Sequence, residues 1–180
     1  MTSILDAVHA QLGPDSIATI SQTIGADPST TSKALSLALP AMVSGLAQNA
    51  SHPHGAAALD NALQQHDGSI LDNLGGLLGG GTASAIGAAI LGHIFGPNRG
   101  PVEDGVGKAS GLDAAQVAKL MTILAPIVMG VLGRMKREKG ADASTLPDIL
   151  GSGQAGGGVD LDNLICMGGS VLGGLFGKKE

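Results

Sequence analysis

The apolar residues of this 180-residue chain recur at the three- and four-residue spacing that is typical of α-helices. In residues 3–12, for example, Ile4, Val8 and Leu12 share one helical face before Gly13 and Pro14 end the segment. The same spacing predicts further helices at residues 15–24, 28–49, 56–66, 83–95, 102–110, 113–139, 145–150 and 160–177. A short helix is also predicted to begin at Ser69 and to end at the glycines of residues 79–81. The sequence therefore predicts an all-α, multi-helical orthogonal bundle.

Two of these helices carry a central segment without a polar face. The segments are ALSLALPAMVSGLAQ at residues 34–48 and LMTILAPIVMGVLGR at residues 120–134. A helix that is apolar all round is buried in a domain core or in an assembly. Each segment has a proline near its middle, Pro40 or Pro126, which removes one backbone hydrogen bond and favours a kink. We expect two kinked core helices.

The two central segments belong to a pattern that repeats at a constant offset of 86 residues. The matched pairs are Gly25/Gly111, Asp27/Asp113, Lys33/Lys119, Pro40/Pro126 and Leu46/Leu132. Ser36 and Thr122 add a hydroxyl four residues before each proline, where it can bond to the loosened backbone. The pattern predicts two pseudo-repeats, each a helix-turn-helix-like unit with a glycine that ends one helix and an aspartate that caps the next.

The repeats lead to a domain organisation in two parts. Residues 1–150 form an internally duplicated helical domain with repeat cores at about residues 14–50 and 100–139. Residues 151–180 hold a glycine-rich linker, residues 151–158, and a C-terminal apolar helix.

Composition excludes several classes of function. The chain has no Trp, no Tyr and two Phe, so readers of single-stranded nucleic acid that stack bases on aromatic rings do not fit. The net charge is −5, and neither half offers the broad positive face that phosphate backbones require. A single cysteine excludes an internal disulfide. The first residues have neither the basic segment nor the apolar segment of a secretory signal. The longest apolar runs are shorter than the ~20 residues that a membrane-spanning helix needs. We expect a soluble cytoplasmic protein.

Three segments carry a resemblance to known proteins. ILGHIFG at residues 90–96, SGLD at residues 110–113 and LAPIVMGVLGR at residues 124–134 resemble the YidB-like bacterial family over roughly residues 1–150. The resemblance implies an all-α fold with a duplicated helical domain in a bacterial cytoplasmic protein. The family has no agreed activity, so it implies no catalytic residue.

Nucleic acid and anionic surfaces are the first candidate partners. The turn spacing matches a DNA-binding helix-turn-helix, whose reading helix would place Lys33 or Lys119 on DNA. One base in each copy is few for this role, so DNA binding is an alternative hypothesis. The basic run at residues 134–139 suits acidic lipid or nucleic acid, but we interpret it as a solvated helix end that the helix dipole favours.

The residues that could carry chemistry form no catalytic set. GGLLGGGT at residues 75–82 lacks the lysine and the preceding strand of a phosphate loop. His52, His54 and His66, with Asp60 and Asp67 nearby, lack the spacing of metal ligands, so we interpret these histidines as surface residues. His93 is interpreted as a hydrogen-bonded interior histidine, and Cys166 as an inert buried thiol. We expect no enzyme activity, no cofactor and no metal.

Glycine spacing gives the remaining signal. Gly169, Gly173 and Gly177 recur every four residues in the C-terminal helix, beside Leu172 and Phe176, and Ala88, Gly92 and Gly96 repeat the spacing. Small residues at this spacing let another helix backbone approach closely. We therefore predict a non-enzymatic protein that associates with itself or with another protein through these residues. Docking of the tail within its own chain and attachment of residues 160–177 to a membrane surface remain alternatives.

Overall fold

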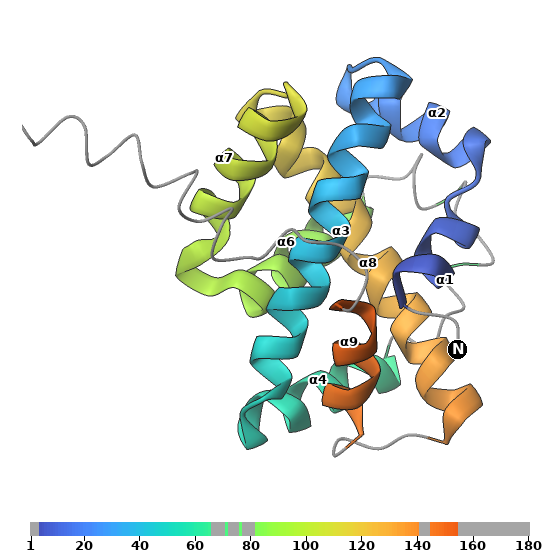
Figure 1. The fold of residues 1–180 in the computed structure, drawn as a ribbon, viewed down its shortest axis with the longest axis vertical. Coiled ribbons are helices and arrows are strands. Elements are labelled where there is room, and N and C mark those ends of the chain that lie inside the picture. The colour runs from blue at the N-terminus through green and yellow to red at the C-terminus, as the bar shows by residue number, and fades with distance from the viewer. Residues whose placement is uncertain (1–3, 66–70, 72–75, 77–81, 141–144, 155–180) are drawn as a thin grey trace, which may run out of the picture.

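The computed structural model describes residues 4–65, 71, 76, 82–140 and 145–154. Over these ranges the chain is all-α and contains no strand, as predicted (Figure 1). The elements are α1 (Ile4–Gln11), α2 (Pro14–Ile24), α3 (Pro28–Ala50), α4 (Pro53–Gln65), α6 (Thr82–Phe95), η2 (Gly96–Asn98), α7 (Arg99–Ser110), α8 (Ala114–Lys139) and α9 (Leu146–Gln154).

The predicted helix ends are confirmed at both helix-turn-helix-like turns. Gly25 and Gly111 adopt left-handed φ values of 76° and 89° and close α2 and α7. Asp27 accepts hydrogen bonds from the backbone of Ser29 and Thr30, at 3.0 and 2.9 Å, and thereby caps α3. Asp113 caps α8 in a reciprocal capping box with Gln116.

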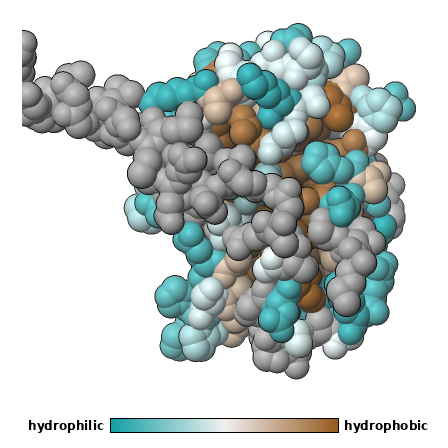
Figure 2. Space-filling view, viewed as in Figure 1, coloured by the Kyte–Doolittle hydropathy of each residue, from teal (hydrophilic) through white to brown (hydrophobic). Residues whose placement is uncertain are grey.

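The long helices α3 and α8 form the centre of the bundle (Figure 1). α8 is buried from Leu120 to Gly133, and α3 is buried from Ala41 to Leu46. α6 packs on α8, whereas α9, α7 and α4 pack on α3, and α1 bridges α8 and α9. On the face that carries α3, hydrophobic residues reach the surface along the middle of the molecule (Figure 2).

The hydroxyls that precede the two prolines bond to the backbone as expected. Ser36 Oγ donates to the Ser32 carbonyl at 3.1 Å, and Thr122 Oγ1 donates to the Ala118 carbonyl at 2.6 Å. The surroundings differ, because Ser36 is exposed and Thr122 is buried. The carbonyl that Pro126 leaves without its helical donor therefore lies inside the bundle.

Two predicted boundaries are wrong. The helix predicted to begin at residue 56 begins instead at Pro53, the first position of α4, where the missing N–H of proline costs nothing. The first four residues of the predicted linker, 151–154, continue α9 as helix. Leu146 and Leu150 are fully buried where α9 meets α3 and α1, and this packing sustains the helix into the glycines.

α8 is long and apolar enough to cross a membrane by length and composition. In the folded chain, however, 78% of its most apolar window is buried. Burial against the surrounding helices accounts for this apolarity, as it does for the core helix of a helical bundle.

The Asp27 cap makes a prediction about acid stability. Hydrogen bonds from the side chains of Ser29 and Thr30, and then from the Thr30 and Ser29 backbone, lower the pKa of Asp27 well below its ordinary value. Because the folded pKa lies below the unfolded pKa of about 3.9, the stabilisation is complete above pH ~4 and is lost as pH falls below it. Asp27→Asn preserves the cap but has no carboxyl to titrate. We expect it to match the wild type in urea unfolding at pH 7 and to lose less stability than the wild type between pH 4 and pH 2. Equal losses would contradict this assignment.

Candidate functional site

The inner face of α6 is held by a close backbone contact with α8. A Cβ atom placed on Gly87 would lie 1.9 Å from the Thr122 carbonyl oxygen and 2.8 Å from the carbonyl carbon. No side chain fits there. Glycine thus lets α6 cover the carbonyl that Pro126 leaves without its helical donor.

A second glycine admits the other end of α6. A Cβ on Gly45 of α3 would lie 2.8 Å from Ile94 Cγ2 and 2.9 Å from Phe95 Cε1. α6 is consequently wedged between α3 and α8, with Leu91 and Phe95 buried. Sequence reasoning missed both contacts, because the glycine pattern it followed lies on a different face of α6.

The outer face of α6 is small, apolar and exposed. It includes Ala85, Ile86, Ala88, Ala89 and Gly92, with the exposed His93 at its edge, and Ile86 is 39% exposed. A Cβ on Gly92 would meet nothing within 4 Å. The predicted association residues Ala88 and Gly92 lie on this face, whereas Gly96, with a φ of 49°, lies just beyond the helix. Their partners in the prediction, Gly169, Leu172, Gly173, Phe176 and Gly177, fall outside the described residues.

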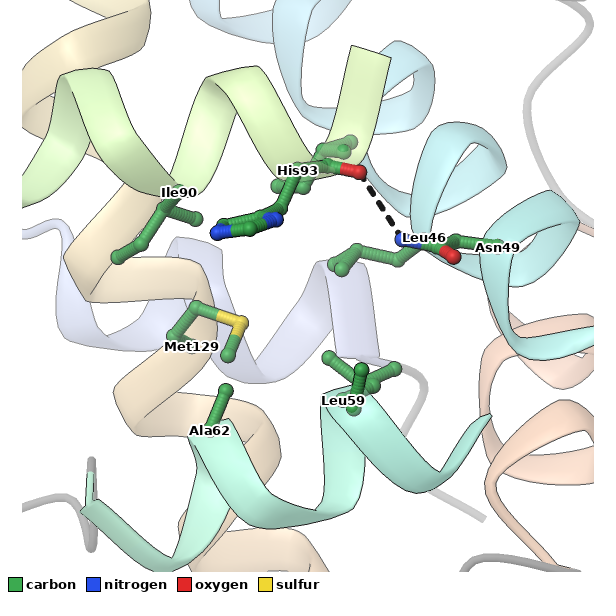
Figure 3. Close-up of a pocket in the computed structure, with 9 residues that line it drawn as sticks. Leu46, Asn49, Leu59, Ala62, Ile90, His93 and Met129 are labelled. Atoms are coloured by element: carbon green, nitrogen blue, oxygen red, sulfur yellow. Dashed lines mark hydrogen bonds between the residues drawn. The ribbon is translucent and has the colours of Figure 1, made fainter. Parts of the chain in front are cut away.

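A pocket lies beside α6, between α3, α4 and α8 (Figure 3). Its volume is about 270 Å³. The lining residues are Leu46, Asn49, Ala58, Leu59, Ala62, Ile90, His93, Ile94 and Met129. Seven of these nine are apolar, so the pocket offers an apolar molecule a surface with few hydrogen-bonding groups.

His93 lies at this pocket and is not an interior residue, which corrects the expectation from sequence. Its side chain is exposed, and Figure 3 shows the ring pointing into the space between Ile90 and Leu46. The Asn49 amide donates to the backbone carbonyl of His93 at 3.0 Å and ties α3 to the end of α6. The helical pattern alone could not show that this position faces an opening.

The wall that α4 forms is fixed at two points. A Cβ on Gly55 would lie 2.0 Å from the Asn49 carbonyl oxygen, so the start of α4 lies directly on the end of α3. Further along, the Asp60 carboxylate pairs with the Lys136 ammonium of α8, and the two side chains are 19% and 14% exposed. Gln64 also donates to Asp60, at 3.1 Å. These contacts hold Leu59 and Ala62 against the pocket.

The basic run at the end of α8 is only partly a solvated helix end. Residues 137–139 are exposed, Gly140 closes the helix, and the basic side chains there suit its dipole. Lys136 instead turns toward Asp60 and is mostly buried. Sequence spacing could not reveal this pair, because Asp60 lies on a helix that is distant in the chain.

The two helix-turn-helix-like turns lie at one end of the molecule (Figure 1). Gln116, in the capping box of α8, donates its Nε2 to the Gly25 carbonyl at 2.9 Å and joins one turn to the other. Lys33 and Lys119, the candidate DNA contacts, are both exposed.

The remaining candidates yield no site in the described part of the chain. His52 and His54 are exposed, as predicted for surface histidines, and the described residues contain no group of three potential metal ligands. His66, Asp67 and Cys166 fall outside the described residues, as does the rejected phosphate loop except for Gly76 and Thr82.

A comparison with protein families finds a match. A family model described as "Bacterial protein of unknown function (DUF937)" matches residues 6–135, which is consistent with the resemblance noted from sequence. No curated protein and no solved structure matches the chain.

Proposed function

Because the chain belongs to the bacterial family of unknown function DUF937, which supplies no activity to transfer, we propose from its own geometry that it is a non-enzymatic cytoplasmic module that associates with copies of itself. The observation that carries this proposal is the outer face of α6. Its five small or apolar residues are exposed, while the opposite face of the helix is buried in the core, so a partner helix could approach this face closely.

The proposed occupant of this face is the C-terminal segment of a second copy, residues 160–177. That segment carries glycine at positions 169, 173 and 177, so as a helix it would present a ridge without side chains to the small residues of α6. The inner face of α6 supports the principle, since Gly87 already allows a helix backbone to lie directly on it. On the outer face, a Cβ added to Gly92 would meet no atom within 4 Å, so this face has room for the same approach.

The core that presents α6 is proposed to be an orthogonal bundle of two duplicated units with kinked central helices. α2 with α3, and α7 with α8, would be the repeats. Their support is the set of paired features 86 residues apart: left-handed glycines, aspartate caps, internal prolines and the hydroxyls before them. Ser36, the residue equivalent to Thr122, is exposed, so within the described residues it is not covered by a helix as Thr122 is covered by α6.

Light scattering at increasing protein concentration tests self-association. Ala88→Glu places a charge on the outer face of α6, and we expect it to lower the association constant at least ten-fold. Truncation after Gln154 should do the same. Ala115→Glu, at another exposed alanine near the start of α8, is the matched control and should associate like the wild type, since an acid suits a helix start. A wild type that stays monomeric at millimolar concentration would contradict the proposal, and unchanged association of Ala88→Glu would place the contact elsewhere.

DNA binding is a second candidate, supported by the joined turns and the exposed Lys33 and Lys119. It requires duplex affinity that falls with salt and falls further when both lysines are replaced by Gln. Electrophoretic mobility at low salt tests it, and an unshifted duplex would remove this candidate.

Attachment to a membrane surface is the remaining alternative. Flotation of the chain with anionic liposomes that is lost on truncation after Gln154 would support it.

A further inference from the structure

We propose that the pocket between α3, α4, α6 and α8 binds a medium-chain aliphatic compound with a single polar end group. The pocket borders the outer face of α6, because His93 at its opening lies four residues after Ala89 and seven after Ile86. Ligand binding in the pocket does not require the proposed self-association. Its lining comes from four helices, so the pocket exists only in the folded chain.

The size of the pocket sets the size of the ligand. A volume of about 270 Å³ corresponds to roughly nine groups of the size of a water molecule, at about 30 Å³ each. A chain of about eight carbons with one polar group has this bulk. The volume lies near the lower limit of pockets that bind small molecules, and such pockets are mostly apolar with few polar groups.

The lining sets the chemistry of the ligand. Leu46, Leu59, Ile90, Ile94 and Met129 offer no hydrogen bond to a polar molecule, so water gains little there and an aliphatic chain gains from leaving solvent. Asn49 already donates to the His93 carbonyl. This leaves the exposed His93 imidazole to bond the polar end of the ligand at the opening (Figure 3).

The walls are suited to hold this shape without a ligand. α4 is fixed at Gly55 and by the ion pair of Asp60 with Lys136, and α6 is fixed by Gly87. Met129, at the side of the pocket opposite His93 in Figure 3, has an adaptable side chain that can adjust to a chain of varying length. A site formed before binding loses little affinity to ordering.

Titration with 1-octanol and, separately, octanoate tests the proposal on the full chain. Binding is followed by the NMR signal of the Met129 methyl group, assigned by its loss in Met129→Leu. We expect a saturable shift of this signal with at least one probe. Ala62→Leu fills the pocket from α4 and should weaken binding at least ten-fold, and Ala58→Leu serves as a second filling variant if the first fails to fold. Ala57→Leu, at an exposed residue of the same helix outside the lining, should bind like the wild type.

The polar end has its own test. His93→Leu should weaken the better-bound probe several-fold, and His93→Gln should restore part of the loss because it keeps a hydrogen-bonding group. If Met129 does not shift up to the solubility limit of both probes, or if filled and wild-type pockets bind equally, the proposal is wrong. Equal binding by His93→Leu would contradict the placement of the polar end.

Discussion

Gly87→Ala is expected to destabilise the protein by about 3 kcal/mol, although alanine is the better helix former. The added methyl group would lie 1.9 Å from the Thr122 carbonyl oxygen. That oxygen belongs to the backbone of a buried helix, so it cannot move aside as the end of a flexible side chain can. α6 would have to shift away from α8, exposing buried residues such as Leu91 and leaving the Thr122 carbonyl without cover. Urea unfolding followed by circular dichroism measures the change.

Gly92→Ala is the matched control on the same helix. Gly92 is exposed, and its added methyl group meets nothing within 4 Å. Only the higher helix propensity of alanine over glycine then acts, so the free energy of unfolding of this variant should rise by about 0.5–1 kcal/mol. If the two variants changed stability equally, the close contact between α6 and α8 would be refuted.

Lys136→Met is expected to lower the free energy of unfolding by about 2 kcal/mol, because it leaves the largely buried Asp60 carboxylate without its cation. The cost lies below that of a fully buried pair, since both side chains keep some exposure. Methionine keeps most of the apolar length of lysine, which separates loss of charge from loss of packing. The measurement is again the free energy of unfolding in urea.

The double variant Asp60→Leu with Lys136→Met should recover most of this loss, because neither charge then remains buried. The pair Arg99–Glu103 on α7, at 2.7 Å, provides the comparison. It spans one helical turn and Arg99 is 31% exposed, so Arg99→Met should cost less than about 1 kcal/mol. A cost at Lys136 no larger than that at Arg99 would show that the Asp60 pair is not what holds α4.

The local features of this fold could be predicted from sequence because their causes are local. Asp27 and Asp113 cap the helices that follow them, and Gly25 and Gly111 adopt the left-handed φ that glycine permits. The start of the helix predicted at residues 56–66 and the linker from residue 151 were placed wrongly for the opposite reason. Packing of α4 and α9 on α3 extends those helices through residues that favour turns.

The candidate sites depend on contacts between residues far apart in the chain. Periodicity and capping act within a few residues, so the amino-acid sequence was enough to predict an all-α chain, its helix caps and two central helices with internal prolines. It did not determine which face of α6 is buried, because Gly87 and Gly92 look alike until α8 lies against one of them. Nor could it pair Asp60 with Lys136, since α4 must first meet α8, or place His93 at a pocket, since four helices must meet before the pocket exists. Tertiary packing alone decided these points.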